Sequence, residues 1–166
     1  MNYNFEKMAN KQKELDHFIR SNSIDKINNE KYFNYRIIAL SVEISELVNE
    51  IRFFKFWSQK KPSEKKIIIN ELVDCFHFAF SVGNTLQNNE WKINFNLDEK
   101  DSFENIYFNL QENLIKLKES KNLKTFYKIM MDITKIAWNL NYSQKDIEEA
   151  YKIKNEINYK RQNSGY

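Results

Sequence analysis

Two glutamates stand three residues apart in the apolar stretch SVEISELVNE at 41–50. Residues i and i+3 are neighbours on a helix surface, so Glu43 and Glu46 would project from one face. An isolated E-x-x-E pattern is usually a solvated surface stripe. The pair therefore indicates a site only if acidic partners lie elsewhere in the chain.

A second acidic pair, Glu71 and Asp74, lies in NELVDCFHF at 70–78, again with a spacing of three. If both segments belong to one antiparallel helix pair, their four carboxylates can face each other. Like charges in a low-dielectric site raise each other's pKa, and a hard divalent cation relieves that repulsion. Mg²⁺ prefers oxygen ligands. The pattern therefore predicts a magnesium site built from Glu43, Glu46, Glu71 and Asp74.

Other metals fit this pattern less well. A zinc site would use more histidine or cysteine ligands, and Cys75 lies off the face that carries Glu71 and Asp74. A di-iron bundle would use Glu-x-x-His pairs. His77 does follow Asp74 by three residues, but no histidine follows either glutamate of the first pair at that spacing. Iron is the weaker alternative.

The elements that must position these acids are predicted to be helices. The chain has only two glycines and one proline, and this scarcity of helix breakers favours long helices. Apolar spacing predicts an all-α bundle of about six helices with long antiparallel central helices and a loop at 88–100. The third helix is apolar on most sides, which is typical of a bundle centre or a subunit interface. The expected helices cover about 5–20, 30–57, 63–87, 101–119, 123–140 and 143–161, with capping patterns at 101–104 and 143–146.

Length and composition exclude several classes of protein. The 166 residues, of which 42% are hydrophobic, predict a single domain over 1–166 or one protomer of an oligomer. The net charge of +3 is small and its charges are interspersed, so nucleic acid is not expected as a direct partner. A single cysteine, no signal peptide and no membrane-spanning run predict a cytoplasmic protein without membrane attachment.

Four blocks of the sequence resemble one family. SVEISELVNEIRFFKFWS and NELVDCFHFAFSVGN are similar to the helical, dimeric dUTPases, a branch of the all-α nucleoside triphosphate pyrophosphohydrolases that also include MazG-type enzymes. QKELD at 12–16 resembles the first-helix segment of that branch, and AYKIKNEINYKRQNSGY at 150–166 resembles its C-terminal K-N-x-x-N-x-x-R-Q motif. The segment 86–140 shows no clear match. The resemblance implies a homodimer that hydrolyses dUTP, and dUDP as well, with two or more Mg²⁺ ions.

The resemblance also assigns roles to residues. It implies that the four acids are the Mg²⁺ ligands, and we expect Glu46, together with Glu43, to act in catalysis by taking a proton from the attacking water. Lys55, in a K-x-W element with Trp57, would lie near the phosphates. The phosphates and the sugar would be held by Lys154, Asn155, Asn158 and Arg161. Residues 154, 158 and 161 form one helical stripe, although basic residues at a helix C-terminus can also simply complement its dipole.

The base would be read from the first helix. Gln12 and Asp16 are one turn apart, so Gln12 can donate to uracil O4 while Asp16 accepts from N3–H. Cytosine would place a lone pair opposite Asp16. Many relatives have Asn where this chain has Asp16, so one donor is lost. Phe78 aligns with an aromatic residue that lies against the base, and His77 either supports the site or is a structural histidine.

Two other functions compete with dUTP hydrolysis. The same acids would serve a MazG-like or dCTP-directed pyrophosphatase with another base pocket. A non-catalytic relative of phage or mobile-element origin would instead bind a protein regulator, for example through 88–122, where Trp91, Phe95 and Phe103 stand among polar residues. Beside the metal pair, Asn49 or Glu50 could position the attacking water, and the sequence does not decide between them.

Overall fold

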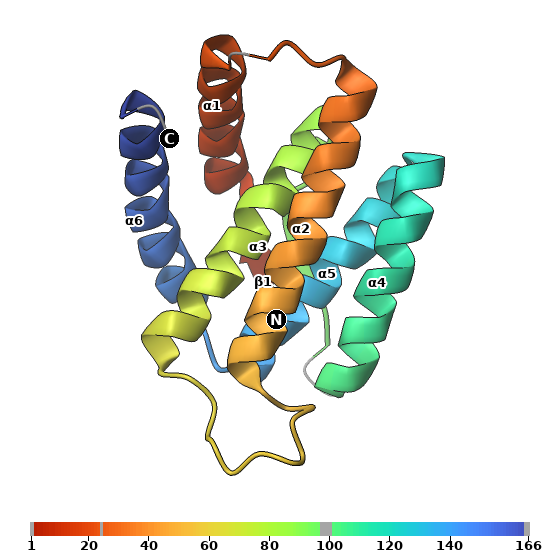
Figure 1. The fold of residues 1–166 in the computed structure, drawn as a ribbon. Coiled ribbons are helices and arrows are strands. Elements are labelled where there is room, and N and C mark those ends of the chain that lie inside the picture. Colours follow the sequence, from red (N-terminus) through yellow and green to blue (C-terminus); the bar gives the residue numbers. More distant parts are fainter. Residues whose placement is uncertain (1, 24, 97–100, 165–166) are drawn as a thin grey trace.

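The computed structural model describes residues 2–23, 25–96 and 101–164. Six helices make up most of this part of the chain, which confirms the predicted all-α class. The long α2 and α3 run antiparallel to each other (Figure 1). The elements are β1 (Asn2–Asn4), α1 (Glu6–Asn22), α2 (Asn29–Ile51), α3 (Lys65–Thr85), β2 (Lys92–Asn94), α4 (Phe103–Ser120), α5 (Leu123–Asn139) and α6 (Gln144–Asn163).

Helix α3 lies at the centre of the bundle. It contacts α1, α2, α5 and α6, and Figure 1 shows α1 and α6 on one side of it and α4 and α5 on the other. Its apolar circumference is therefore used within this chain. Its buried residues also include polar ones, namely Asp74, His77 and Ser81. Burial of polar groups is costly unless they are paired or functional, so this helix carries chemistry as well as packing.

Gly83 allows close packing at the C-terminal end of α3. A Cβ atom added there would lie 2.5 Å from Phe126 Cζ and 2.6 Å from Trp91 Cη2. Both rings are buried, so they have little room to move away. The absence of a side chain at this position lets α5 and the segment before β2 approach the central helix.

Helix α2 ends earlier than the sequence pattern predicted. The apolar run FFKFW led to an expected end near Trp57, but the helix stops at Ile51 and Arg52 adopts a left-handed conformation with φ 63°. The Arg52 N–H donates to the Val48 carbonyl, which closes the last turn. The side chain of Phe56 is 92% exposed, so this run does not continue the buried face of the helix. The predicted boundary was wrong because apolar residues alone did not reveal the turn.

Residues 88–100, expected as a loop, contain a short strand. Strand β2 pairs antiparallel with β1, with Tyr3 opposite Ile93. Both of these side chains are buried, whereas their neighbours in the strands are exposed. The hydroxyl of Tyr3 donates to the Tyr142 carbonyl at 3.0 Å. This ribbon holds the start of α1 against the turn between α5 and α6.

Of the two predicted capping patterns, one is as expected and one is shifted. Ser143 and Asp146 form a complete capping box at the start of α6. At the start of α4 the cap is Ser102, which accepts from the Asn105 N–H, whereas Asp101 had been expected. Within the part of the chain that the structure describes, no helix combines the length and apolarity needed to cross a membrane.

Candidate functional site

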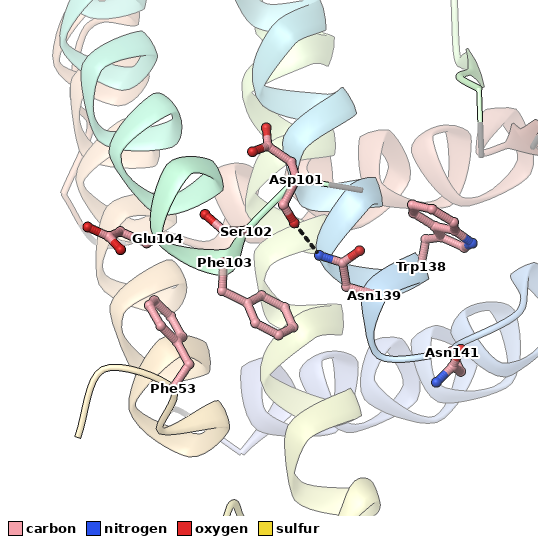
Figure 2. Close-up of a pocket in the computed structure, with 8 residues that line it drawn as sticks. All are labelled: Phe53, Asp101, Ser102, Phe103, Glu104, Trp138, Asn139 and Asn141. Carbon is pink, nitrogen blue, oxygen red and sulfur yellow. Dashed lines mark hydrogen bonds between the residues drawn. The ribbon is translucent and has the colours of Figure 1, made fainter. Parts of the chain in front are cut away.

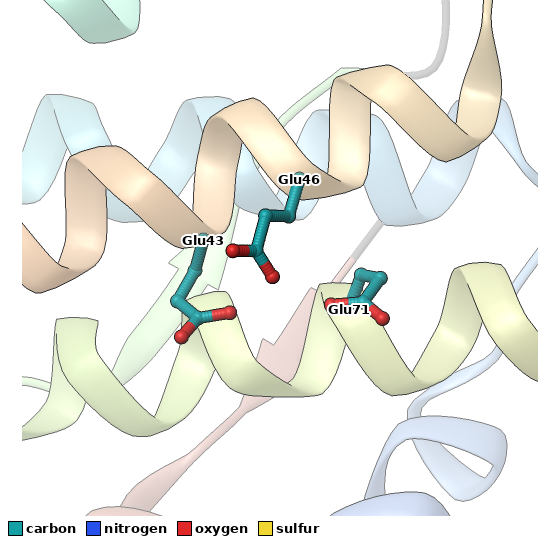
Figure 3. Close-up of side chains that lie close together, drawn as sticks. All are labelled: Glu43, Glu46 and Glu71. Atoms are coloured by element: carbon teal, nitrogen blue, oxygen red, sulfur yellow. The ribbon is translucent and has the colours of Figure 1, made fainter.

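Three acids meet between the two central helices. Glu43 and Glu46 project from α2 toward Glu71 on α3, and one carboxylate oxygen from each lies within 4.8 Å of the others (Figure 3). The helical spacing of three places the α2 pair on one face, and the antiparallel packing of α2 on α3 brings Glu71 opposite that face. The sequence had predicted this juxtaposition.

The cluster is electrostatically unfavourable without a cation. Burial, followed by the charges of Asp74, Glu46 and Glu71, raises the pKa of Glu43 to about 7. Burial and the charge of Asp74 also raise the pKa of Glu71. A divalent cation would relieve this repulsion, and carboxylate oxygens are the donors that Mg²⁺ prefers. The donor set of the site therefore fits magnesium.

The fourth predicted ligand, Asp74, lies beside this cluster but outside the group of three. It is buried on α3, and Lys154 of α6 donates a hydrogen bond to its Oδ2 in an ion pair. Burial raises the pKa of Asp74, although the hydrogen bond and charge of Lys154 lower it. A carboxylate of the predicted metal set is thus balanced here by an ammonium group of the predicted phosphate-binding helix.

A cavity of about 310 Å³ adjoins the acids and is formed by four helices. Its walls combine an acidic edge, an apolar floor and a basic side. Nearly all of the residues predicted to bind substrate lie in or next to it. The lining residues are Gln12, Leu15, Ile19, Arg36, Glu43, Asp74, His77, Phe78, Lys154, Asn158, Arg161 and Gln162.

Three predicted binding residues lie outside this lining, namely Asp16, Asn155 and Lys55. Asp16 accepts a hydrogen bond from the lining residue Gln12. Asn155 is buried on the neighbouring face of α6, and its Nδ2 has no hydrogen-bond partner among the described residues. Lys55 follows α2 and donates to Asn49 Oδ1. Asn49 belongs to a second hollow, of about 530 Å³, which also includes Glu46 and Glu71. Lys55 is therefore linked through Asn49 to this second hollow, whereas Lys154 lines the first cavity.

Glu50, a candidate for positioning water, also lines this second hollow. Its carboxylate accepts from the hydroxyl of Ser63, and its carbonyl accepts from the Ser63 N–H at 3.0 Å. These two bonds close the segment between α2 and α3. Glu50 thus has a structural role at the base of that segment.

A hydrogen-bonded chain joins the cavity residues Gln12 and His77 to Asp16 and Tyr151, which lie outside the lining. Gln12 Nε2 donates to Asp16 Oδ1 at 2.8 Å, and Gln12 Oε1 lies 2.6 Å from His77 Nδ1 and 3.1 Å from the Tyr151 hydroxyl. An amide oxygen only accepts, so Nδ1 carries the hydrogen of His77. Burial lowers the pKa of His77 to about 3, which keeps the ring neutral. Its Nε2 is therefore an acceptor, and among the described residues it has no partner.

Arg36 is a site residue that the sequence interpretation missed. Its Nη2 lies 3.5 Å from Asp16 Oδ1 and donates to the Tyr32 hydroxyl at 3.1 Å. Its guanidinium carbon lies 5.6 Å from the centre of the Phe78 ring. A signal was present, because Arg36 precedes Glu43 by two helical turns and so shares its face of α2. Tyr151, which stacks on His77 with ring centres 4.1 Å apart, was also missed.

A separate cavity of about 530 Å³ lies where α4 begins and α5 ends (Figure 2). Phe53 and Phe103 stack across it with ring centres 5.6 Å apart, and Asn139 donates to the Asp101 carbonyl at 3.0 Å. Ser102 caps α4 in the same place. These polar groups are engaged in holding local structure, and none of the predicted site residues lines this cavity.

The aromatic residues proposed as a docking surface have a different position from the expected one. Trp91 and Phe95 are buried, and Phe103 packs against Phe53. Trp91 packs against Phe80 of α3 and Phe126 of α5, and Phe95 packs against Trp138 of α5, so both belong to the core. Phe103 lies on α4 and is partly buried against that core. Among the described residues of 88–122, the large apolar side chains that are exposed are instead Phe108 and Ile115, on α4.

One comparison with known proteins identifies a family. The family model described as dUTPase matches residues 4–166, which is nearly the whole chain. The match includes 86–140, where the sequence blocks gave no resemblance. No curated protein is similar enough to this chain to count as a match.

Proposed function

Because the chain belongs to the dUTPase family and is by that membership a dUTP diphosphatase, we propose that it hydrolyses dUTP to dUMP and pyrophosphate in a Mg²⁺-dependent reaction at the acidic cluster. The observation that carries the proposal is the meeting of Glu43, Glu46 and Glu71 within 4.8 Å beside a cavity with a basic wall. Carboxylates that can bind a metal ion therefore lie next to basic side chains that can bind a polyphosphate. We expect dUDP to be hydrolysed as well.

The acids of α2 and α3 would hold two or more Mg²⁺ ions, with Asp74 joining Glu43, Glu46 and Glu71. Bound magnesium supplies a water of lowered pKa and neutralises charge on the phosphates. Glu46, on the exposed side of the cluster, is our candidate for the group that takes the proton from the attacking water. Glu43 assists as its neighbour on the same face.

Helix α6 would bind the triphosphate and the sugar. Lys154, Asn158 and Arg161 line the cavity from one stripe of this helix, and a guanidinium group matches phosphate oxygens in a forked geometry. If Asp74 binds the metal ion, the ammonium group of Lys154 would be released from its ion pair with Asp74 and could bind a phosphate instead. We propose that Asn155 supports this stripe from behind and that Lys55 reaches the phosphates from the side of the second hollow.

The base would lie on the α1 side of the cavity. Asp16 accepts from uracil N3–H, and Gln12, whose Nε2 has a second hydrogen besides the one given to Asp16, donates to a carbonyl oxygen. Phe78 offers a ring face at the cavity wall. Comparing dUTP with dCTP and dTTP separates this reading from a dCTP-directed or MazG-like enzyme.

The deciding experiment measures pyrophosphate release from dUTP with Mg²⁺ and with EDTA. We expect release only with Mg²⁺, and we expect Glu46→Gln to lower kcat at least about a hundredfold, as for loss of a general base. Glu149→Gln is the matched control, because Glu149 is an exposed glutamate of α6 whose ion pair among the described residues is with Lys145, four positions earlier on the same helix. Full activity of Glu46→Gln, with unchanged helix content by circular dichroism, would overturn the assignment.

We further propose that the chain forms a homodimer in the cytoplasm. Tyr35, Ile38 and Val42 form an exposed apolar stripe on α2, and Trp57 is exposed nearby in sequence. A protein regulator bound through 88–122 stays a prediction, with Phe108 and Ile115 as its candidate contacts.

A further inference from the structure

We propose that Arg36 determines base specificity together with Asp16: Asp16 accepts from N3–H of uracil while the guanidinium of Arg36 donates to O4, so that Gln12, expected from the sequence at O4, donates to O2 instead. The inference rests on the proposed function and adds to it a residue on α2 that neither the sequence motifs nor the family match assigns. The base site would then be formed by residues from both α1 and α2.

Arg36 is held in place from three sides. Its Nη2 donates to the Tyr32 hydroxyl at 3.1 Å and lies 3.5 Å from Asp16 Oδ1. Its guanidinium carbon lies 4.8 Å from the centre of the Tyr32 ring and 5.6 Å from that of Phe78. The side chains of Arg36 and Asp16 are 15% and 13% exposed, so water screens this pair little. Such an arrangement fixes the direction of the donors before a ligand arrives.

The chemistry of Asp16 creates a need for such a donor. A carboxylate only accepts, whereas an asparagine amide in its place would also donate. The edge of uracil presents acceptor, donor and acceptor in the order O4, N3–H and O2. Gln12 Nε2 already gives one hydrogen to Asp16 Oδ1. In the part of the chain that the structure describes, both polar contacts of Arg36 use Nη2, so hydrogens on Nε and Nη1 remain to meet a carbonyl oxygen.

Asp16 and Arg36 would disfavour cytosine, because an acceptor would face an acceptor and a donor would face a donor. The unprotonated N3 of cytosine would point its lone pair at the carboxylate of Asp16, and its 4-amino group would meet a donor instead of an acceptor. Discrimination by unpaired polar groups in a shielded site is stronger than discrimination by shape alone. Phe78 completes the site as a surface that both the base and the guanidinium can contact.

The test compares kcat/KM for dUTP and dCTP in the wild type and in Arg36→Met. We expect the substitution to lower the value for dUTP by about tenfold to a hundredfold, the range typical of losing one good base-reading contact. The ratio of dUTP to dCTP should narrow by a similar factor. Arg36→Lys keeps the charge but not the planar fork, so it should restore only part of the ratio.

Arg20→Met is the matched control. The guanidinium carbon of Arg20 also lies 4.8 Å from the Tyr32 ring centre, but Arg20 does not line the cavity that Arg36, Gln12 and Phe78 line. It should leave the dUTP to dCTP ratio at the wild-type value. If Arg36→Met does not fold, Arg36→Lys decides alone: an unchanged ratio in that variant overturns the inference.

The two proposals fail in different ways. A wild-type protein without activity on dUTP would overturn the proposed function. An active wild type whose Arg36 variants keep both the dUTP rate and the dUTP to dCTP ratio would overturn the role of Arg36 alone.

Discussion

Both burial and the neighbouring acids raise the pKa of the Glu43 carboxyl group. Its pKa in the folded chain is raised to about 7, whereas a glutamate in an unfolded chain has a pKa of about 4.3. The folded chain therefore keeps this proton at pH values where the unfolded chain has lost it. The stability contributed by Glu43 is present below the unfolded value and is lost as the pH rises through about 7.

We expect the metal-free protein to lose more stability between about pH 6 and pH 8 than its Glu43→Gln variant does. This difference in lost stability between the two proteins should stay below about 1 kcal/mol, because Glu43 is partly exposed and solvent screens its charge. Chemical denaturation in EDTA at both pH values measures it. His77, whose pKa is lowered to about 3, titrates only in the unfolded chains and contributes equally to both proteins. Identical pH dependence in the two would contradict the electrostatic description.

At the same scale, the sequence predicted which acids meet but not how they are balanced. Glu43, Glu46 and Glu71 follow from helical spacing and antiparallel packing alone. The pairing of Asp74 with Lys154 depends on where α6 docks, and no local pattern contains that information. Arg36 could have been found from its spacing to Glu43. It was missed because a single arginine on an amphipathic helix is usually solvated.

At the scale of elements, helices were predicted well and their interruptions poorly. Helix α2 carries the metal pair in its last three turns and then ends at Arg52 without a glycine or proline to mark the place. The ribbon of β1 and β2 contributes only one buried side chain per strand, which is too short a pattern to distinguish from a loop. Both features are set by long-range packing.

Gly83 offers a prediction about the packing of these elements. Gly83→Ala should lower the free energy of unfolding by about 1–3 kcal/mol, because the new methyl group overlaps the rings of Phe126 and Trp91. This cost should outweigh the roughly 1 kcal/mol that alanine gains over glycine in helix propensity. Denaturant unfolding measures the change.

Phe126→Leu provides the compensating control for that change. In the double variant the smaller side chain makes room for the methyl group, so the combined loss should be smaller than the sum of the single losses. Simple additivity would show that the crowding at Gly83 is not the cause.

At the scale of the whole molecule, the fold class and the central position of the third helix were predicted. The sequence left open whether the apolar surface of that helix faces neighbours or a second subunit. Its contacts with α1, α2, α5 and α6 show that this apolar surface faces neighbours within the chain. The apolar stripe exposed on α2 is the surface that favours a partner, because Tyr35, Ile38 and Val42 recur at helical spacing.

Ile38→Glu should therefore convert the proposed dimer into monomers. Ile38 is 58% exposed in the single chain, and a charge buried in an interface without a partner costs several kcal/mol. Light scattering coupled to size exclusion gives the mass. Ile153→Glu, a similarly exposed isoleucine on α6, should leave it unchanged. A monomeric wild type would contradict the proposed assembly.

The contacts of β1 have a consequence for how the molecule handles its substrate. Asn4 exchanges backbone hydrogen bonds with the Gln144 side chain, at 2.9 and 3.1 Å, where α6 begins. The helix that carries Gln12 and the helix that carries Lys154 are thereby tethered at one end. If α1 and α6 bind the base and the phosphates as proposed, loosening this tether would let the two helices move independently. The affinity for the nucleotide would then fall, while the acids between α2 and α3 would keep their mutual spacing.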